Sequence, residues 1–187
     1  KSLKLNPNLP EVHNNLGLMF HEGQNLLDEA IESFSRALSL SPNFLEAHYN
    51  LGNAYSAQGR LEEALASYSE ALHINPNYVT AHGNLGNVYK KQNRFKDALD
   101  CYNKALSIDP TFEKIYYNMG LLHLSNGQAT DAFNCLRRAA KSSPEDGRMW
   151  TAWAESLVSY TFETFDENLL DDLDNLEKVE IVDKFQN

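Results

Sequence analysis

Four asparagines recur at one place along the chain and offer the same chemistry each time. They are Asn15, Asn50, Asn84 and Asn118, and each directly precedes a Leu-Gly or Met-Gly pair. An asparagine amide carries donors and an acceptor, so it can pair with both backbone groups of a peptide residue whatever the side chain. Two interpretations are open at this stage: the amides hold an extended peptide, or they bond only to neighbouring helices and water.

Histidines and cysteines recur with a similar spacing, which argues against shared metal or disulfide chemistry. His13, His48 and His82 occupy one repeat place, and Cys101 and Cys135 another. Packed helices lie about 8–10 Å apart, beyond the roughly 7 Å between Cα atoms that a disulfide allows. We therefore expect no metal site and two free thiols. Free thiols favour a cytoplasmic or other reducing compartment.

Motifs for catalysis or cofactor binding are not found in the sequence. It has no phosphate-binding loop, dinucleotide-binding glycine pattern or nucleophile elbow, and His21-Glu22 lacks the second histidine of a zinc-protease helix. We therefore predict no catalytic residues, no cofactor and no enzymatic activity in this stretch of chain.

The charge of the chain is acidic and unevenly distributed. The 187 residues carry a formal net charge of -10, and residues 160–187 hold nine acids and two lysines. Phosphate binding needs clustered Lys and Arg, so nucleic acid is excluded as the main ligand. No apolar run approaches the roughly 18 residues of a membrane span, and no cationic amphipathic helix is present for lipid.

The elements that carry these residues follow from a repeat marked by proline. Pro42, Pro76, Pro110 and Pro144 are each 34 residues apart. A fixed set of residues travels with each proline, and in the second copy the set is Leu51-Gly52, Tyr55, Ala64, Tyr68, Ala71 and Pro76. The apolar spacing predicts one helix over 45–58 and a second over 61–74, with Gly59 as a left-handed C-cap between them. Gly52 and Ala64 should lie where the two helices cross, with Tyr55 and Tyr68 filling the space beside them.

This 34-residue pattern resembles the tetratricopeptide repeat. The resemblance implies an all-α fold, a right-handed superhelical solenoid of helix-turn-helix repeats. The expected divisions are the end of a truncated preceding repeat (1–9), four repeats (10–44, 45–78, 79–112, 113–146), a capping helix (147–159) and an acidic amphipathic C-terminal segment (160–187). In that segment, the pattern predicts a helix over about 165–178.

The resemblance also implies that the first helix of each repeat faces a concave groove. Similar asparagine ladders, notably in O-linked N-acetylglucosamine transferase, grip the backbone of an extended peptide. The peptide-binding residues expected here are Asn15, Asn50, Asn84, Asn118, Tyr49, Asn53, Asn87, Lys90, Lys114 and Tyr117. Because Lys90, Lys91, Lys114 and Arg148 lie in the later part of the array, we expect an acidic ligand to favour that part.

The function that these observations favour is a protein-interaction module that binds a peptide or partner segment in the groove. Two alternatives remain open: a substrate-recruiting arm of a larger transferase, and a scaffold that self-assembles into homo-oligomers through its open ends. A further hypothesis is that residues 160–187 fold against Lys90, Lys91 and Lys114 and compete with the ligand.

Overall fold

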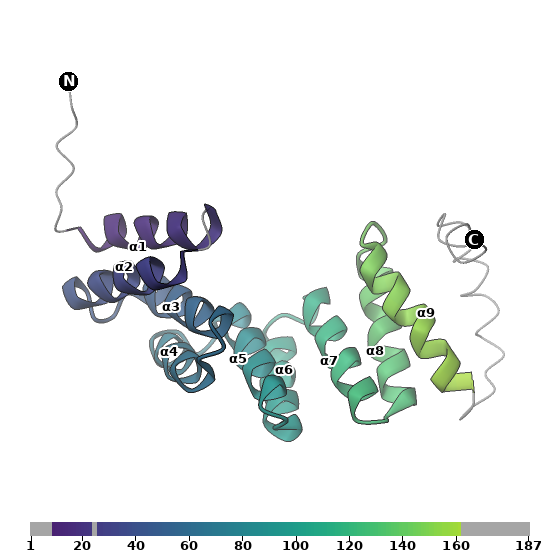
Figure 1. Ribbon diagram of the computed structural model, residues 1–187. Coiled ribbons are helices and arrows are strands. Elements are labelled where there is room, and N and C mark those ends of the chain that lie inside the picture. Colours follow the sequence, from purple (N-terminus) through teal and green to yellow (C-terminus); the bar gives the residue numbers. More distant parts are fainter. Residues whose placement is uncertain (1–8, 24–25, 162–187) are drawn as a thin grey trace. The chain divides into compact units, whose positions relative to one another are not determined.

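The computed structural model describes residues 9–23 and 26–161, and every regular element in these ranges is a helix (Figure 1). Of the expected segments 1–9 and 160–187, residues 1–8 and 162–187 lie outside the described residues. The predicted helix over 165–178 and the proposed competition of segment 160–187 with the ligand fall there too. The elements are α1 (Pro10–Leu18), the π-helical turn η1 (Met19–Gly23), α2 (Leu27–Leu40), α3 (Leu45–Ala57), α4 (Leu61–Ile74), α5 (Val79–Lys91), α6 (Phe95–Ile108), α7 (Glu113–Ser125), α8 (Ala129–Ser142) and α9 (Gly147–Thr161).

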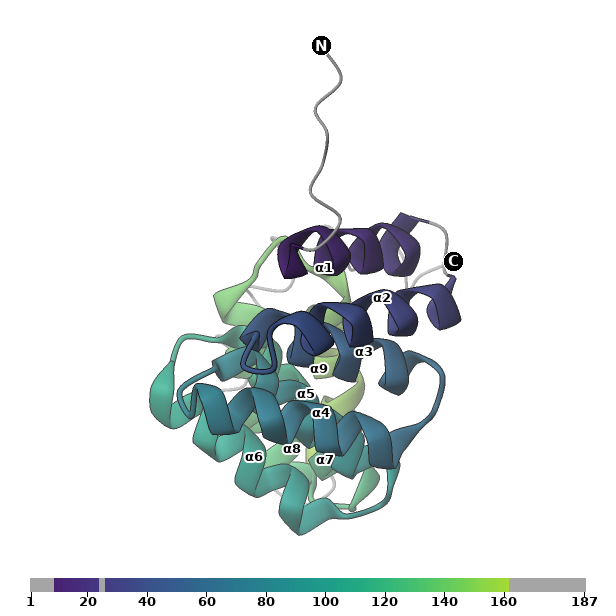
Figure 2. The ribbon, with the colours of Figure 1, turned by 90° about the vertical axis from the view of Figure 1, so that its left-hand side faces the viewer.

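The chain divides into two compact units, which we call unit 1 (Lys1–Pro110) and unit 2 (Thr111–Asn187). Unit 1 holds three helical hairpins, α1–α2, α3–α4 and α5–α6, and α2 packs on α3 as α4 packs on α5. Figure 2 shows these hairpins from the end that α1 and α2 form. Unit 2 holds the hairpin α7–α8, with α9 packed on α8 and touching α7. None of the helices in the described part of the chain is both long and apolar enough to cross a membrane.

Each hairpin closes on a glycine of its first helix, as the sequence predicts. A Cβ added to Gly52 would lie 2.7 Å from two carbons of the Tyr68 ring, which is almost fully buried. The same contact joins Gly17 to Phe34, Gly86 to Tyr102 and Gly120 to Leu136. The absence of a side chain therefore lets the large residue of the second helix lie against the backbone of the first.

The turn between the two helices of a hairpin uses left-handed backbone. Gly59 has φ 76° and Gly127 has φ 72°, which confirms the C-cap predicted at Gly59. In the third repeat Asn93 takes this place with φ 58°, because asparagine tolerates the left-handed region better than other side chains. The first repeat has one residue more than the others between Phe20 and Ala30, and the π-helical turn η1 begins this segment.

Three of the prolines that end a repeat, Pro42, Pro76 and Pro144, are joined to the following first helix by a side chain. The Nε2 atoms of His48 and His82 lie 2.8 and 2.9 Å from the carbonyl oxygens of Pro42 and Pro76. A carbonyl oxygen only accepts, so Nε2 carries the proton in both rings. Trp150 donates from Nε1 to the carbonyl oxygen of Pro144 at 3.0 Å in the same way. These histidines thus have a structural task.

Candidate functional site

The first helices of unit 1 form one continuous face. α1 contacts α3, and α3 contacts α5, in addition to the packing of each first helix on its own second helix. Among the described helices of this unit, no comparable contact joins α2 to α4 or α4 to α6. The first helices therefore lie on the narrower, inner side of unit 1. We call the surface of α1, α3 and α5 the inner face.

Three of the four ladder asparagines, Asn15, Asn50 and Asn84, lie on the helices of this face, and two of their amides are tied to the preceding repeat. Asn84 donates from Nδ2 to the Tyr49 hydroxyl at 3.1 Å and to Oδ1 of Asn53 at 2.8 Å. Asn50 donates from Nδ2 to Oδ1 of Asn14, a buried residue, at 3.0 Å. The side-chain N–H groups of Asn50 and Asn84 thus agree with the interpretation in which the ladder amides bond to neighbouring helices. The carbonyl oxygens of Asn50 and Asn84 accept no bond from the described residues.

The other two ladder residues differ from these. Asn15 is exposed on α1, and Asn118 is half-buried on α7 in unit 2. Neither side chain makes a hydrogen bond within the part of the chain that the structure describes. The ladder place therefore carries two kinds of asparagine: Asn50 and Asn84, which join repeats, and Asn15 and Asn118, whose side chains make no hydrogen bond in the described part of the chain.

Asn53 and Asn87, also expected to bind peptide, are held by tyrosines of their own hairpins. The Tyr68 hydroxyl donates to Oδ1 of Asn53 at 2.7 Å, and the Tyr102 hydroxyl donates to Oδ1 of Asn87 at 2.7 Å. Burial raises the pKa of both tyrosines above the usual value, so the hydroxyls stay protonated and keep donating. Sequence reasoning did not foresee these bonds. Asn53 in addition accepts the Asn84 amide, so it links three helices.

Tyr49 lies at the centre of the inner face. Its ring packs 5.0 Å from the Tyr78 ring and 6.0 Å from the Tyr68 ring, measured between centroids. In the described part of the chain, the Tyr49 hydroxyl accepts the Asn84 bond and has no acceptor for its own proton. Tyr49 and Asn84 are both partly exposed, so this hydroxyl and the Asn84 carbonyl oxygen form an adjacent donor and acceptor.

The lysines expected to favour an acidic ligand are in unequal surroundings. Lys90 is half-buried at the end of α5, where burial and then the charge of Lys91 lower its pKa. Lys91 donates to the Ser56 carbonyl oxygen at 3.2 Å and is held by the preceding repeat. Lys114 is exposed on α7, in unit 2.

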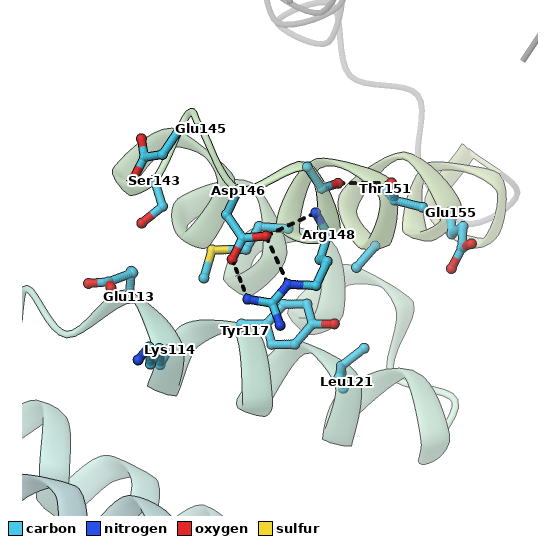
Figure 3. A pocket seen from close by; sticks show the side chains of 13 residues that line it. Glu113, Lys114, Tyr117, Leu121, Ser143, Glu145, Asp146, Arg148, Thr151 and Glu155 are labelled. Carbon is cyan, nitrogen blue, oxygen red and sulfur yellow. Dashed lines mark hydrogen bonds and ion pairs between the residues drawn. The ribbon is translucent and has the colours of Figure 1, made fainter. Parts of the chain in front are cut away.

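Unit 2 has a cavity of about 880 Å³ between α7 and the start of α9, which includes Lys114 and Tyr117 (Figure 3). Its apolar lining comes from Tyr117, Leu121, Met149 and Ala152. Arg148 lies over it but is held by Asp146, whose Oδ2 accepts from Nη2 at 2.7 Å and whose Oδ1 accepts from Nε at 3.0 Å. These bonds lower the pKa of Asp146 and raise that of Arg148. We call this space the unit 2 cavity.

Comparison with known proteins agrees with this architecture. A model described as TPR repeat matches residues 24–59, 52–93 and 86–127, and a model described as Tetratricopeptide repeat matches residues 113–146. No curated protein sequence gives a match.

Solved structures with the same fold include three that cover most of this chain. A crystal structure of MamA is 28% identical with a TM-score of 0.69, covering 78% of this chain and 85% of that chain. A thermophilic TPR protein of Thermus thermophilus is 26% identical with a TM-score of 0.72, covering 83% and 85%. MamA from Desulfovibrio magneticus RS-1 is 18% identical with a TM-score of 0.74, covering 91% and 94%, and at that identity shows the fold alone. The chain is an all-α helical-repeat scaffold for protein interactions and belongs to the tetratricopeptide repeat family.

Proposed function

We propose that the inner face of unit 1 binds an extended segment of a partner protein through its backbone. One observation carries this proposal: the Tyr49 hydroxyl proton and the Asn84 carbonyl oxygen are left without partners in the described part of the chain. The two side chains are joined by the 3.1 Å bond from Asn84 Nδ2 to the Tyr49 hydroxyl oxygen, which fixes them next to each other. A peptide unit offers the matching pair, a carbonyl oxygen for the hydroxyl and an N–H for the amide oxygen.

Because the Tyr49 and Asn84 side chains are already held in place, they are suitable for binding a ligand. The Asn84 amide is also held by Asn53, and the Tyr49 ring is held between Tyr68 and Tyr78. Side chains that are already ordered lose little conformational freedom when a ligand binds. Each hydrogen bond to a ligand is worth about 1 kcal/mol net, so a few such bonds suggest micromolar or weaker binding for this face alone.

The test uses a phage-displayed library of random peptides captured by the full chain, followed by affinity measurements on purified captured peptides. Tyr49→Phe removes the donor and keeps the ring in place. Loss of one bond of about 1 kcal/mol weakens binding about fivefold. Tyr102→Phe is the matched control, because it removes a tyrosine hydroxyl that bonds only within its own hairpin. Equal affinities for the two variants would refute the assignment of Tyr49.

A further inference from the structure

The unit 2 cavity is lined by more acidic side chains than the sequence of the later repeats suggests. The later repeats are expected to favour an acidic ligand because of Lys114, Tyr117 and Arg148. The cavity is lined, however, by four acids, Glu113, Glu145, Asp146 and Glu155, against two bases, Lys114 and Arg148. The balance of the lining charges is therefore negative.

Arg148 contributes little free positive charge to this balance. Its guanidinium makes two bonds to the Asp146 carboxylate, and its backbone N–H donates to Oδ1 of the same carboxylate at 3.0 Å. A bidentate pair of this kind fixes the planar guanidinium and neutralises it locally. In Figure 3 the guanidinium points toward Asp146, and the Arg148 side chain as a whole is 81% exposed.

The three remaining carboxylates lie around the cavity without a cation of their own. Glu113 is in the first turn of α7, Glu145 is in the turn before α9, and Glu155 is on α9. Figure 3 places Glu113 and Glu145 toward one end of the cavity and Glu155 toward the other. Within the residues that the structure describes, none of the three forms a salt bridge. Lys114 is the only remaining cation among the residues that line this cavity.

We propose that the unit 2 cavity receives a bulky apolar side chain of a partner segment in which lysine or arginine lies close by in sequence. The apolar side chain contacts Tyr117, Leu121 and Met149, and its cationic neighbours reach the carboxylates at the ends of the cavity. This inference rests on the proposed function and specifies the chemistry of the ligand. The acidic segment 160–187 of this chain has the wrong charge for the cavity.

The experiment compares two triple variants of the full chain with the same change in net charge. The first variant is Glu113→Gln, Glu145→Gln and Glu155→Gln, around the cavity. The control is Glu32→Gln, Glu70→Gln and Asp100→Asn, three exposed acids on the second helices α2, α4 and α6. The probes are peptides captured by the wild-type chain from a phage-displayed random library, measured by fluorescence anisotropy at low and high salt.

Captured peptides should be enriched in a large apolar residue next to Lys or Arg. Their affinity should fall about two- to fivefold for each carboxylate lost from the cavity at low salt, with a smaller effect at high salt and no change for the control. Replacing the apolar residue of a captured peptide by Ser should also weaken binding, which tests the apolar lining without altering the protein.

Three outcomes separate this inference from the proposed function. Enrichment of Asp or Glu, or equal affinities for the two triple variants, would overturn the assignment of the cavity while leaving the inner face of unit 1 intact. Sensitivity to the cavity variant together with insensitivity to Tyr49→Phe would support the cavity and overturn the role of Tyr49. A wild-type chain that captures no peptide would overturn both.

Discussion

Replacing each ladder asparagine by alanine should affect stability differently according to the bonds of its amide. Asn84→Ala loses two hydrogen bonds, to Tyr49 and Asn53, worth about 1 kcal/mol net each. Alanine is the better helix former by about 0.5 kcal/mol, which offsets part of the loss. The Asn53 oxygen keeps the Tyr68 hydroxyl, so no buried acceptor is left without a donor. The free energy of unfolding should therefore fall by about 1 to 1.5 kcal/mol.

The same substitution elsewhere in the ladder supplies the controls. Asn50→Ala leaves the oxygen of the buried Asn14 without its donor, which costs about 1–3 kcal/mol, so after the gain in helix propensity its expected net cost is about 0.5–2.5 kcal/mol. Asn15 is exposed on α1 and makes no side-chain bond in the described structure, so Asn15→Ala should stabilise by about 0.5 kcal/mol through helix propensity alone. The helix-propensity contribution is common to all three variants, and the difference between Asn84→Ala and Asn15→Ala isolates the bonds.

The assay is urea unfolding followed by far-ultraviolet circular dichroism, with the midpoint and the slope compared among variants. Helical repeats need not unfold in one step, so only variants with unchanged slopes are compared. Equal shifts of the midpoint for Asn15→Ala and Asn84→Ala would refute this account, because the amide bonds between repeats would then contribute nothing measurable.

Two further predictions concern packing and pH. Gly52→Ala places a Cβ 2.7 Å from the Tyr68 ring, so we expect an overpacking cost of about 1–3 kcal/mol that outweighs the helix-propensity gain of about 1 kcal/mol. Gly147→Ala is the control, because no atom lies within 4 Å of its added Cβ, and it should not destabilise the protein. Equal thermal midpoints for the two variants would contradict this prediction. Burial raises the pKa of the Cys101 and Cys135 thiols to about 11, whereas the pKa of an unfolded thiol is about 8.5. Their contribution to stability is complete below the unfolded pKa and is lost as the pH rises toward about 11, so the free energy of unfolding should fall over that window more in wild type than in a Cys101→Ala, Cys135→Ala variant.

The repeated hairpins could be predicted from the sequence because they depend on short-range physics. A proline every 34 residues, a small residue at the helix crossing and a glycine at the turn specify the hairpin locally. The predicted helices over 45–58 and 61–74 agree with α3 and α4 to within one residue. Of the two tyrosines expected beside the crossing glycine, Tyr55 and Tyr68, Tyr68 is the one whose ring lies against Gly52.

The bonds between a first-helix asparagine and a second-helix tyrosine can be recognised from the sequence. Asn53 pairs with Tyr68 and Asn87 with Tyr102, at a constant separation of 15 residues. Where the asparagine becomes Leu18 or Leu121, the second-helix residue becomes Phe34 or Leu136, which has no hydroxyl. The amide and the hydroxyl therefore appear and disappear together within one chain, as expected for partners.

The direction of each amide and the charge balance of the unit 2 cavity could not be predicted. A repeat place fixes the position of Asn84 on its helix, but its amide is turned by Tyr49 and Asn53, which lie 35 and 31 residues earlier. Similarly, Arg148 is not a free cation, because Asp146 in the turn before α9 accepts bonds from both its backbone N–H and its guanidinium. Side-chain geometry of this kind depends on the folded turn.

The bond from a ring N–H to the proline carbonyl defines which piece of chain is a transferable module. His82 is joined to Pro76, and the backbone between them is the turn that separates consecutive hairpins. A graft that begins at the first residue of α5 would leave this proline behind and expose its carbonyl to whatever sequence precedes it. A repeat moved between arrays should therefore be cut on the N-terminal side of its proline, so that each module brings its own turn, its own ring and the helix pair that follows.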